Sequence, residues 1–148
     1  MSSAPVEAPL IRLVDDAGRA FRDHMVRAGA AAGFPELRAT HDAVFAHLPA
    51  EGGRISVLAA RAGMTKQSMA EIVRDLERLG LVRVDQDPSD ARAKLVRYTR
   101  RGWRVVRGGQ RHIDEVEDRL AGALGEERLA DLREMLGVVA EVLDGGDG

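Results

Sequence analysis

The chain of 148 residues contains no cysteine. Disulfides, thiolate metal sites and thiol-based sensing of oxidants are therefore excluded. Aromatic residues are scarce, with three Phe, one Trp and one Tyr, too few for the stacking platforms that hold single-stranded nucleic acid. Apolar runs of membrane-spanning length are missing, and the first residues lack the basic charge and apolar core of a secretion signal. We therefore expect a cytoplasmic protein with no membrane partner.

Patterns of enzymatic chemistry are also missing. Asp23 and His24 are sequence neighbours, as are His41 and Asp42, and neighbouring helical residues point about 100° apart, so neither pair forms a catalytic dyad. Serine-nucleophile and phosphate-loop motifs are absent. The histidines could meet carboxylates at a metal, but His41 and His47 occupy different helix faces. We predict no enzyme activity, no cofactor and no bound metal, with a metal-responsive regulator as an alternative.

Residues 65–79 have the ends and faces of an amphipathic helix. Thr65 can cap its N-terminus, and Gly80 can supply the left-handed residue that ends it. Apolar residues at helical spacing form one inward arc: Met69, Ile72, Val73, Leu76 and Leu79. Upstream, Ser56 can cap a short helix over residues 57–62. Only Gly63 and Met64 separate it from the next helix, and so short a link forces the two helices to cross steeply. This arrangement is typical of a helix-turn-helix.

The segments on either side of this helix pair predict the rest of a winged fold. Residues 81–85 and 93–98 are rich in Val, Leu and Tyr, and the residues between them have the composition of a loop, which indicates an antiparallel hairpin. Upstream, Thr40 can cap a helix that continues to Leu48, and the dipeptide at 54–55 can add a short strand. We predict a mainly α fold with a small β wing.

The wing and the residues after it contain two linked patterns, Asp87-x-x-Asp90-x-Arg92 and Tyr98-Thr99-x-x-Gly102. With these patterns, residues 54–102 resemble the MarR family of bacterial winged-helix regulators. The resemblance implies that Arg92 enters the minor groove of DNA and that Asp90 orients its guanidinium group. It also implies a ligand pocket between the dimer helices and the winged domain, for which the candidate lining residues are His24, His41 and Phe45. Tyr98, where Leu is usual, and the pair at 70–71 depart from the family pattern.

The formal net charge of −2 hides two oppositely charged segments. Residues 54–111 contain 14 Lys and Arg against 6 Asp and Glu, a net charge of +8. Residues 112–148 contain 3 against 11, a net charge of −8, and the first 53 residues contain 5 against 7. A cationic segment can bind phosphate, whereas an acidic segment is repelled by a duplex. The charge pattern therefore predicts one surface that faces DNA.

The candidate DNA contacts fall into two groups besides the wing. The residues expected in the major groove lie on the outer face of the 65–79 helix: Lys66, Gln67, Ser68, Ala70, Glu71 and Arg74. The residues expected at phosphates are Arg54, Thr65, Arg78, Lys94 and Arg97. Further basic candidates lie in the wing and the following helix: Arg83, Arg100, Arg101, Arg104 and Arg107.

Apolar stripes at helical spacing also lie outside the winged segment. They comprise Leu10, Leu13, Val14, Ala17, Phe21, Met25 and Ala28; Ile113, Val116, Leu120 and Leu124; and Leu129, Leu132, Leu136, Val139 and Leu143. One winged domain needs only part of these faces for its own core. We therefore expect dimerisation helices within residues 10–33 and 112–144, with a monomeric helix bundle as the alternative.

The resulting prediction is one MarR-like domain over residues 1–148. Its winged helix-turn-helix spans residues 36–107, with the recognition helix at 65–79 and the wing at 81–98. A homodimer of this kind would bind double-stranded DNA at a pseudo-palindromic operator. We expect a transcriptional repressor released by a small aromatic or phenolic ligand. The alternative from a different class is an adaptor whose wing binds protein.

Overall fold

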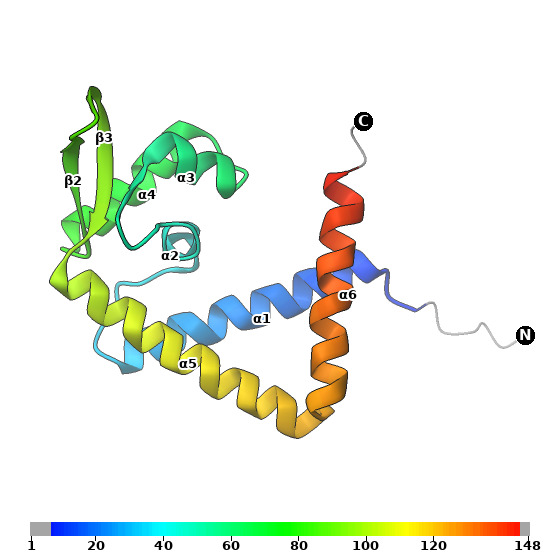
Figure 1. Ribbon diagram of the computed structural model, residues 1–148. Helices are drawn as coiled ribbons and strands as arrows, with labels where there is room; N and C mark the ends of the chain where they lie inside the picture. Colours follow the sequence, from blue (N-terminus) through cyan, green and yellow to red (C-terminus); the bar gives the residue numbers. More distant parts are fainter. Residues whose placement is uncertain (1–6, 146–148) are drawn as a thin grey trace, which may run out of the picture. The chain divides into compact units, whose positions relative to one another are not determined.

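The computed structural model describes residues 7–145, which fall into two compact units divided between Gly109 and Gln110. The boundary lies within helix α5 (Arg100–Leu124). The first unit also contains, in chain order (Figure 1), α1 (Leu10–Ala31), the 3-10 helix η1 (Ala39–His41), α2 (Asp42–Phe45), β1 (Gly53–Arg54), α3 (Ile55–Arg61), α4 (Lys66–Arg78), β2 (Val82–Asp87) and β3 (Asp90–Tyr98). The second unit contains the end of α5 and α6 (Glu126–Asp144).

Helices α3 and α4 form the helix-turn-helix. Gly63 lies between them with φ of +63°, a left-handed conformation that only glycine adopts without strain. Thr65 caps α4 as expected, because its Oγ1 accepts a hydrogen bond from the backbone N of Ser68 at 3.1 Å. Gly80, with φ of +73°, follows the other end of the helix. The sequence signals at both ends of α4 are therefore confirmed.

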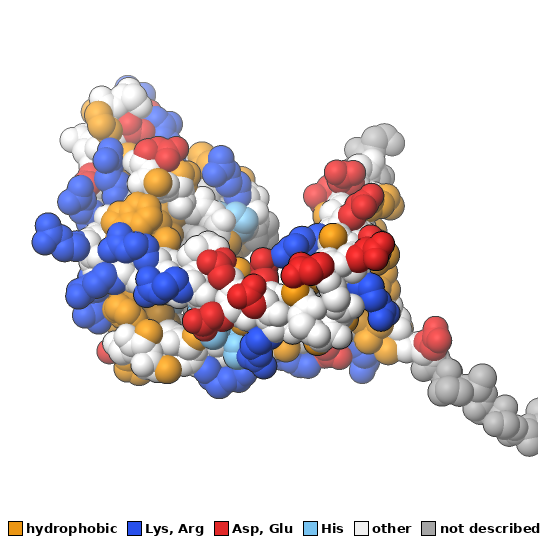
Figure 2. Space-filling view, turned by 60° about the horizontal axis from the view of Figure 1, so that its bottom comes forward, with side chains coloured by type: hydrophobic (Ala, Val, Ile, Leu, Met, Phe, Trp, Pro, Cys, Tyr) orange, Lys and Arg blue, Asp and Glu red, His pale blue; other side chains and the backbone are white. Residues whose placement is uncertain are grey.

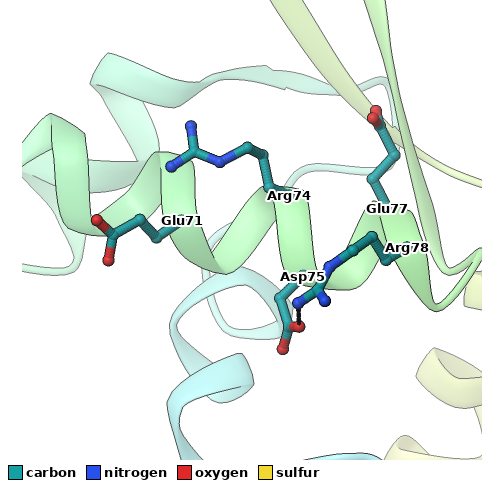
Figure 3. Close-up of a pocket in the computed structure, with 5 residues that line it drawn as sticks. All are labelled: Glu71, Arg74, Asp75, Glu77 and Arg78. Atoms are coloured by element: carbon teal, nitrogen blue, oxygen red, sulfur yellow. Dashed lines mark hydrogen bonds and ion pairs between the residues drawn. The ribbon is translucent and has the colours of Figure 1, made fainter.

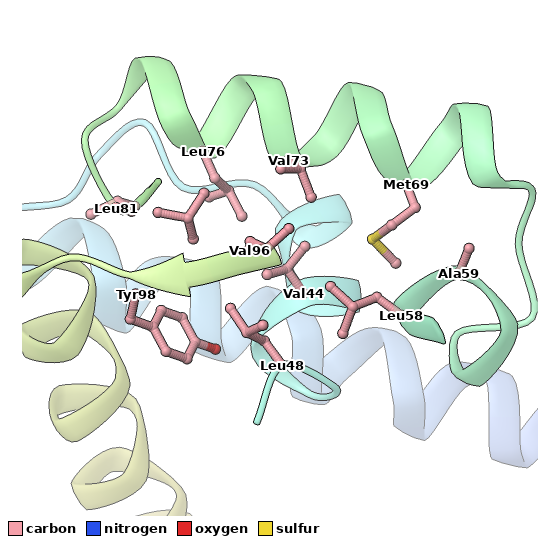
Figure 4. Close-up of a cluster of buried hydrophobic side chains, with 11 residues drawn as sticks. Val44, Leu48, Leu58, Ala59, Met69, Val73, Leu76, Leu81, Val96 and Tyr98 are labelled. Atoms are coloured by element: carbon pink, nitrogen blue, oxygen red, sulfur yellow. The ribbon is translucent and has the colours of Figure 1, made fainter. Parts of the chain in front are cut away.

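The inner face of α4 is anchored in the apolar core of the first unit (Figure 4). The buried side chains of this core are Val44, Leu48, Leu58, Ala59, Met69, Val73, Leu76, Leu81, Val82, Val96 and Tyr98. Three of them come from one stripe of α4, as its period of 3.6 residues requires. Tyr98 stacks on Phe45 with ring centroids 6.1 Å apart, and burial raises the pKa of Tyr98 to about 12. The core thus holds α4 by one face and leaves the other face exposed.

The sheet has the strand order β1-β3-β2 and is antiparallel throughout. Its hairpin is longer than the sequence indicates, because only two residues separate β2 from β3 and the expected loop over 86–92 is wrong. Two side-chain contacts stabilise the extension: Gln86 Nε2 donates to Ala91 O at 2.8 Å, and Asp87 Oδ1 accepts from Ser89 N at 2.9 Å. Asp90 and Arg92 therefore lie on a strand.

The Tyr98-Thr99-x-x-Gly102 pattern forms the junction between the wing and α5. Thr99 Oγ1 donates to Gly80 O at 2.6 Å and accepts from Gly102 N at 3.0 Å. The first turn of α5 also lies against the backbone, since a Cβ on Gly102 would be 1.9 Å from Leu81 O. Glycine at this position allows α5 to start directly beside the end of α4.

Two helix starts differ from the sequence expectations. The Thr40-capped helix is replaced by η1 and the single turn of α2, because His41 Nδ1 accepts a hydrogen bond from Arg38 N at 3.0 Å. Ser56 does not cap α3, which begins one residue earlier, at Ile55. Arg54 pairs with Leu95 in the sheet and has extended dihedral angles, so the chain passes from β1 directly into the helix.

In the second unit, the end of α5 and α6 meet at Gly125, whose φ is +88°. An ion pair of 2.7 Å joins Arg133 Nη2 on α6 to Glu117 Oε2 on α5. Leu129 is buried, whereas Leu136 and Leu143 are 45% and 75% exposed. Much of the apolar surface of α6 is therefore uncovered in a single chain. Within residues 7–145, no helix is long and apolar enough to cross a membrane.

Candidate nucleic-acid interface

The outward face of α4 is exposed and polar. Lys66, Gln67, Glu71 and Arg74 are all exposed, and Ala70 is partly buried between them. Ser68 contributes to the cap, because its Oγ accepts a hydrogen bond from Thr65 Oγ1 at 2.9 Å. These six positions were all expected in the major groove, and the structure brings them together around the first two to three turns of one helix.

The C-terminal half of α4 is bonded to its surroundings through Asp75. His41 Nδ1 accepts from Arg38 N, so His41 Nε2 donates to Asp75 Oδ2, at 2.7 Å. Arg38 and Arg78 also form ion pairs with the same carboxylate. The hydrogen bond from His41 and then the contact with Arg38 hold the pKa of Asp75 below its usual value. This cluster fixes the orientation of α4 relative to η1.

Glu77 connects α4 to the wing. Its Oε2 accepts a hydrogen bond from the backbone N of Val84 on β2 at 3.1 Å. The contact satisfies a strand amide with a side chain from the neighbouring helix. This hydrogen bond holds α4 in a fixed position relative to the wing.

At the far end of the wing, Arg92 and Lys94 are exposed on β3. Asp90 Oδ1 accepts a hydrogen bond from the backbone N of Arg92 at 3.0 Å. The carboxylate thus shapes the backbone beside Arg92, and its predicted contact with the guanidinium group stays a prediction for the DNA-bound state. Both wing residues are positioned by a strand, which is a more rigid support than the loop expected from the sequence.

Arg54, a predicted phosphate contact, is bound to the base of the wing hairpin. Its Nε and Nη2 lie 2.8 and 2.7 Å from Asp87 Oδ2, and the Asp87 side chain is 8% exposed. Hydrogen bonds from Ser89 and then from Arg54 lower the pKa of Asp87 to about 2. Arg54 is therefore first a structural partner of Asp87, although 40% of its side chain remains exposed.

Two other basic candidates share an acidic neighbour on the sheet. Asp85 Oδ2 lies 2.9 Å from Arg83 Nε and 3.9 Å from Arg97 Nε. The positions 83 and 97 are paired across the two strands, which places their side chains on the same face. Arg78 is likewise paired with Asp75. Lys94, by contrast, is an exposed cation at the wing with its ammonium group available for phosphate.

Basic side chains gather on one face of the first unit, as Figure 2 shows in blue. Along α5, the exposed cations in this unit are Arg100, Arg101, Arg104 and Arg107. The guanidinium carbon of Arg101 lies 5.1 Å from the ring centre of Phe34, a distance typical of a cation–π contact. This face can attract a polyanion before any specific contact forms.

A depression of about 430 Å³ runs along the exposed side of α4 (Figure 3). Its lining is entirely charged: Glu71, Arg74, Asp75, Glu77 and Arg78. In the part of the chain that the structure describes, the Glu71 and Arg74 side chains make no hydrogen bond or ion pair, whereas Asp75 and Arg78 are joined. Sequence reasoning missed Arg38 and Asp75, because a contact between residues 37 positions apart leaves no local pattern.

The three candidate ligand-pocket residues occupy different environments. His24 is partly buried on α1. His41 is 1% exposed and uses both ring nitrogens in hydrogen bonds, so neither nitrogen is available to a ligand in this conformation. Phe45 stacks on Tyr98 at the edge of the core. Among the described residues, no group of three or more His, Asp or Glu is arranged to hold a metal ion.

Helices α3 and α4 cross and are joined by a short link, and the β2–β3 hairpin follows them. Strand β3 of this hairpin pairs with β1, which precedes the helices. This arrangement defines a winged helix-turn-helix protein. A family model described as "MarR family" matches residues 50–93. The chain is therefore similar to the MarR family of transcriptional regulators, whose model matches this segment and whose solved members share the fold. No curated protein sequence gave a match.

Solved structures extend the likeness over nearly the whole chain. Sco3205 from Streptomyces coelicolor, a MarR family regulator solved with DNA, is 25% identical with a TM-score of 0.70, covering 95% of this chain and 94% of its own. PcaV from the same organism, solved with its natural ligand, is 25% identical with a TM-score of 0.71 over 95% and 98%. CouR from Rhodococcus jostii RHA1, bound to p-coumaroyl-CoA, is 25% identical with a TM-score of 0.72 over 93% and 96%.

Proposed function

We propose that the protein is a transcriptional regulator that binds double-stranded DNA at a specific sequence. The observation that supports this most directly is the division of α4, whose inner face is buried in the core while its polar outer face is exposed beside a basic wing. A helix of about 10–12 Å diameter fits the major groove of B-form DNA. Such a regulator acts in the cytoplasm, where a bacterial chromosome lies.

The residue roles follow from position. The outer face of α4 enters the major groove with Lys66, Gln67, Ser68, Ala70, Glu71 and Arg74. Arg92 enters the minor groove from the wing, with Asp90 shaping the strand beside it. The phosphate contacts are Arg54, Thr65, Arg78, Lys94 and Arg97. Lys94 is a stronger candidate than Arg54 or Arg78, which already have carboxylate partners.

The binding species is a homodimer on a pseudo-palindromic operator. A single chain leaves apolar side chains exposed on α1 and α6, among them Leu13 at 53% and Val142 at 67%. A second copy of the chain is the partner that supplies the same apolar surface in return, as a two-fold interface requires. Two recognition helices related by that axis would bind half-sites about one helical turn apart.

The regulator is a repressor that a small aromatic or phenolic ligand releases from DNA. The ligand-bound structures of PcaV and CouR support this proposal by fold and sequence similarity. A ligand that favours a dimer with mis-spaced recognition helices must lower the affinity for DNA. By linkage, bound DNA lowers the affinity for the ligand by the same factor. Calorimetry with small aromatic acids, with and without operator, tests this linkage, and equal ligand heats in both states would contradict it.

Selection of bound sequences from random duplex DNA tests the central proposal. The expected result is one enriched motif with two-fold symmetry, whose affinity falls steeply with added salt through release of counterions. Arg92→Ala should weaken binding by roughly 1–3 kcal/mol, while Arg128→Ala, which removes an exposed cation from α6, should leave the affinity nearly unchanged. Lack of a motif, with salt-independent binding to protein, would favour an adaptor instead.

A further inference from the structure

The polar outer face of α4 divides into two halves with different chemistry. In the C-terminal half, Asp75, Glu77 and Arg78 are all held by partners within the chain. In the N-terminal half, the side chains of Lys66, Gln67, Glu71 and Arg74 are exposed and make no hydrogen bond or ion pair with the rest of the described chain, 7–145. The N-terminal half can therefore bond to DNA without first breaking an internal contact.

Glu71 is the unusual member of this set, since it is the one acidic side chain in it. A carboxylate in a DNA groove is repelled by the phosphates, so it weakens binding to every sequence that offers it no donor. The C4 amino group of cytosine is the base donor that a carboxylate accepts from in the major groove. An unpaired Glu71 thus weakens binding to sequences without a cytosine at the matching position. At the correct site, the hydrogen bond from cytosine offsets the repulsion, so the repulsion contributes to specificity.

Arg74 complements Glu71 on the same helix. Residues three positions apart lie about 4.5 Å apart along the axis and on the same face of the helix, somewhat more than the 3.4 Å spacing of successive bases. Figure 3 shows both side chains extending in the same direction along α4, away from the Asp75–Arg78 pair. An arginine with an unoccupied guanidinium group bonds in bidentate fashion to O6 and N7 of guanine.

We propose that Glu71 and Arg74 are the specificity-determining pair of this regulator, with Glu71 selecting a cytosine and Arg74 a guanine at neighbouring positions in each half-site. The inference rests on the proposed function and specifies which bases the recognition helix distinguishes. Glu71 lowers affinity for non-cognate DNA, and Arg74 supplies the attractive contact. The operator therefore contains a G·C-rich step that faces the middle of α4.

The test compares motifs selected from random duplex DNA by the full-length protein and by Glu71→Gln. Glutamine has the same size and bonds preferentially to adenine through N6 and N7. The variant should therefore change the preferred base from cytosine to adenine at one position of each half-site and keep all other positions. Its preference for the original site over the adenine site should change by roughly 5- to 150-fold. Binding to random DNA should become tighter, because one negative charge is lost.

Glu77→Gln is the matched control, because it makes the same chemical change on the same helix at a carboxylate bonded to Val84 N. Its motif should equal that of the unchanged protein, and circular dichroism should show that both variants fold. An unchanged motif for Glu71→Gln, or the same shift in Glu77→Gln, would overturn the inference while the proposed function stands. Failure of the unchanged protein to enrich any motif would overturn the proposed function as well.

Discussion

Gly102 is a residue whose side chain must be absent for the fold to close. A Cβ at this position would lie 1.9 Å from Leu81 O, far inside any real contact distance, and the atom it meets is backbone. We expect Gly102→Ala to lower the free energy of unfolding by about 3 kcal/mol, measured by urea denaturation. Gly109→Ala is the control on the same helix, since its Cβ would meet Met25 Cε at an ordinary 3.7 Å. It should stabilise the protein by about 0.5–1 kcal/mol through helix propensity.

Asp87 predicts how stability depends on acid pH. Its pKa is about 2 in the folded chain, lowered from 3.8 by Ser89 and Arg54. A carboxyl group with a depressed pKa in the folded state stabilises the protein above its unfolded pKa, and this contribution is lost as the pH falls from about 4 toward 2. The unfolding free energy should therefore decline over that window. Asp87→Asn should decline less, and equal declines in denaturation experiments would refute the assignment.

At the scale of single elements, the attachment of α4 to η1 depends on the Asp75 carboxylate. Removing it would leave the Nε2–H of His41 without an acceptor, in a side chain only 1% exposed. A buried donor without a partner costs about 1–3 kcal/mol, so Asp75→Ala should lower stability by that amount. Glu71→Ala, at an exposed and unpaired position of the same helix, should change stability by less than about 0.5 kcal/mol. Thermal unfolding measures both stability changes. Equal losses in the two variants would mean that the contacts of Asp75 with His41, Arg38 and Arg78 do not stabilise the fold.

The elements that the sequence predicts well are those whose signals are local. The cap at Thr65, the left-handed turns at Gly63 and Gly80 and the 3.6-residue apolar stripe all lie within α4 or next to it. The hairpin was predicted but its length was not, because Gln86 and Asp87 replace loop conformations with specific side-chain bonds.

The candidate site divides in the same way. Exposure of the α4 outer face follows from periodicity, so its residues could be named from the sequence. The sequence could not show which of these residues lack an internal partner, because the partners of Asp75 and Glu77 come from η1, the preceding link and β2. Long-range contacts of this kind have no sequence period, and they determine which charges remain for DNA.

For the whole molecule, the exposed apolar surface predicts an oligomeric state. On α6, Leu136 is 45% exposed, and Met135, Val138 and Val142 add a second stripe that the sequence expectation had not included. Apolar surface on this scale is usually covered by another chain. Leu136→Glu should therefore convert a dimer into a monomer by placing a charge in the interface, as measured by light scattering after gel filtration. Val57→Glu, which replaces an apolar residue of α3 that is 43% exposed, should leave the dimer intact.

The same variant also tests whether dimerisation and DNA recognition are coupled. In a dimer the second recognition helix binds at an effective concentration set by the first, which raises affinity for a two-site operator by roughly 10²- to 10⁴-fold over one half-site. Leu136→Glu retains every residue of α4 and the wing, so its affinity for an isolated half-site should equal that of the unchanged protein. Its affinity for the full operator should fall to nearly the same value. If the monomeric variant still discriminated strongly between the full operator and a half-site, the two-fold arrangement of recognition helices would be wrong, because a single α4 cannot contact two half-sites one helical turn apart.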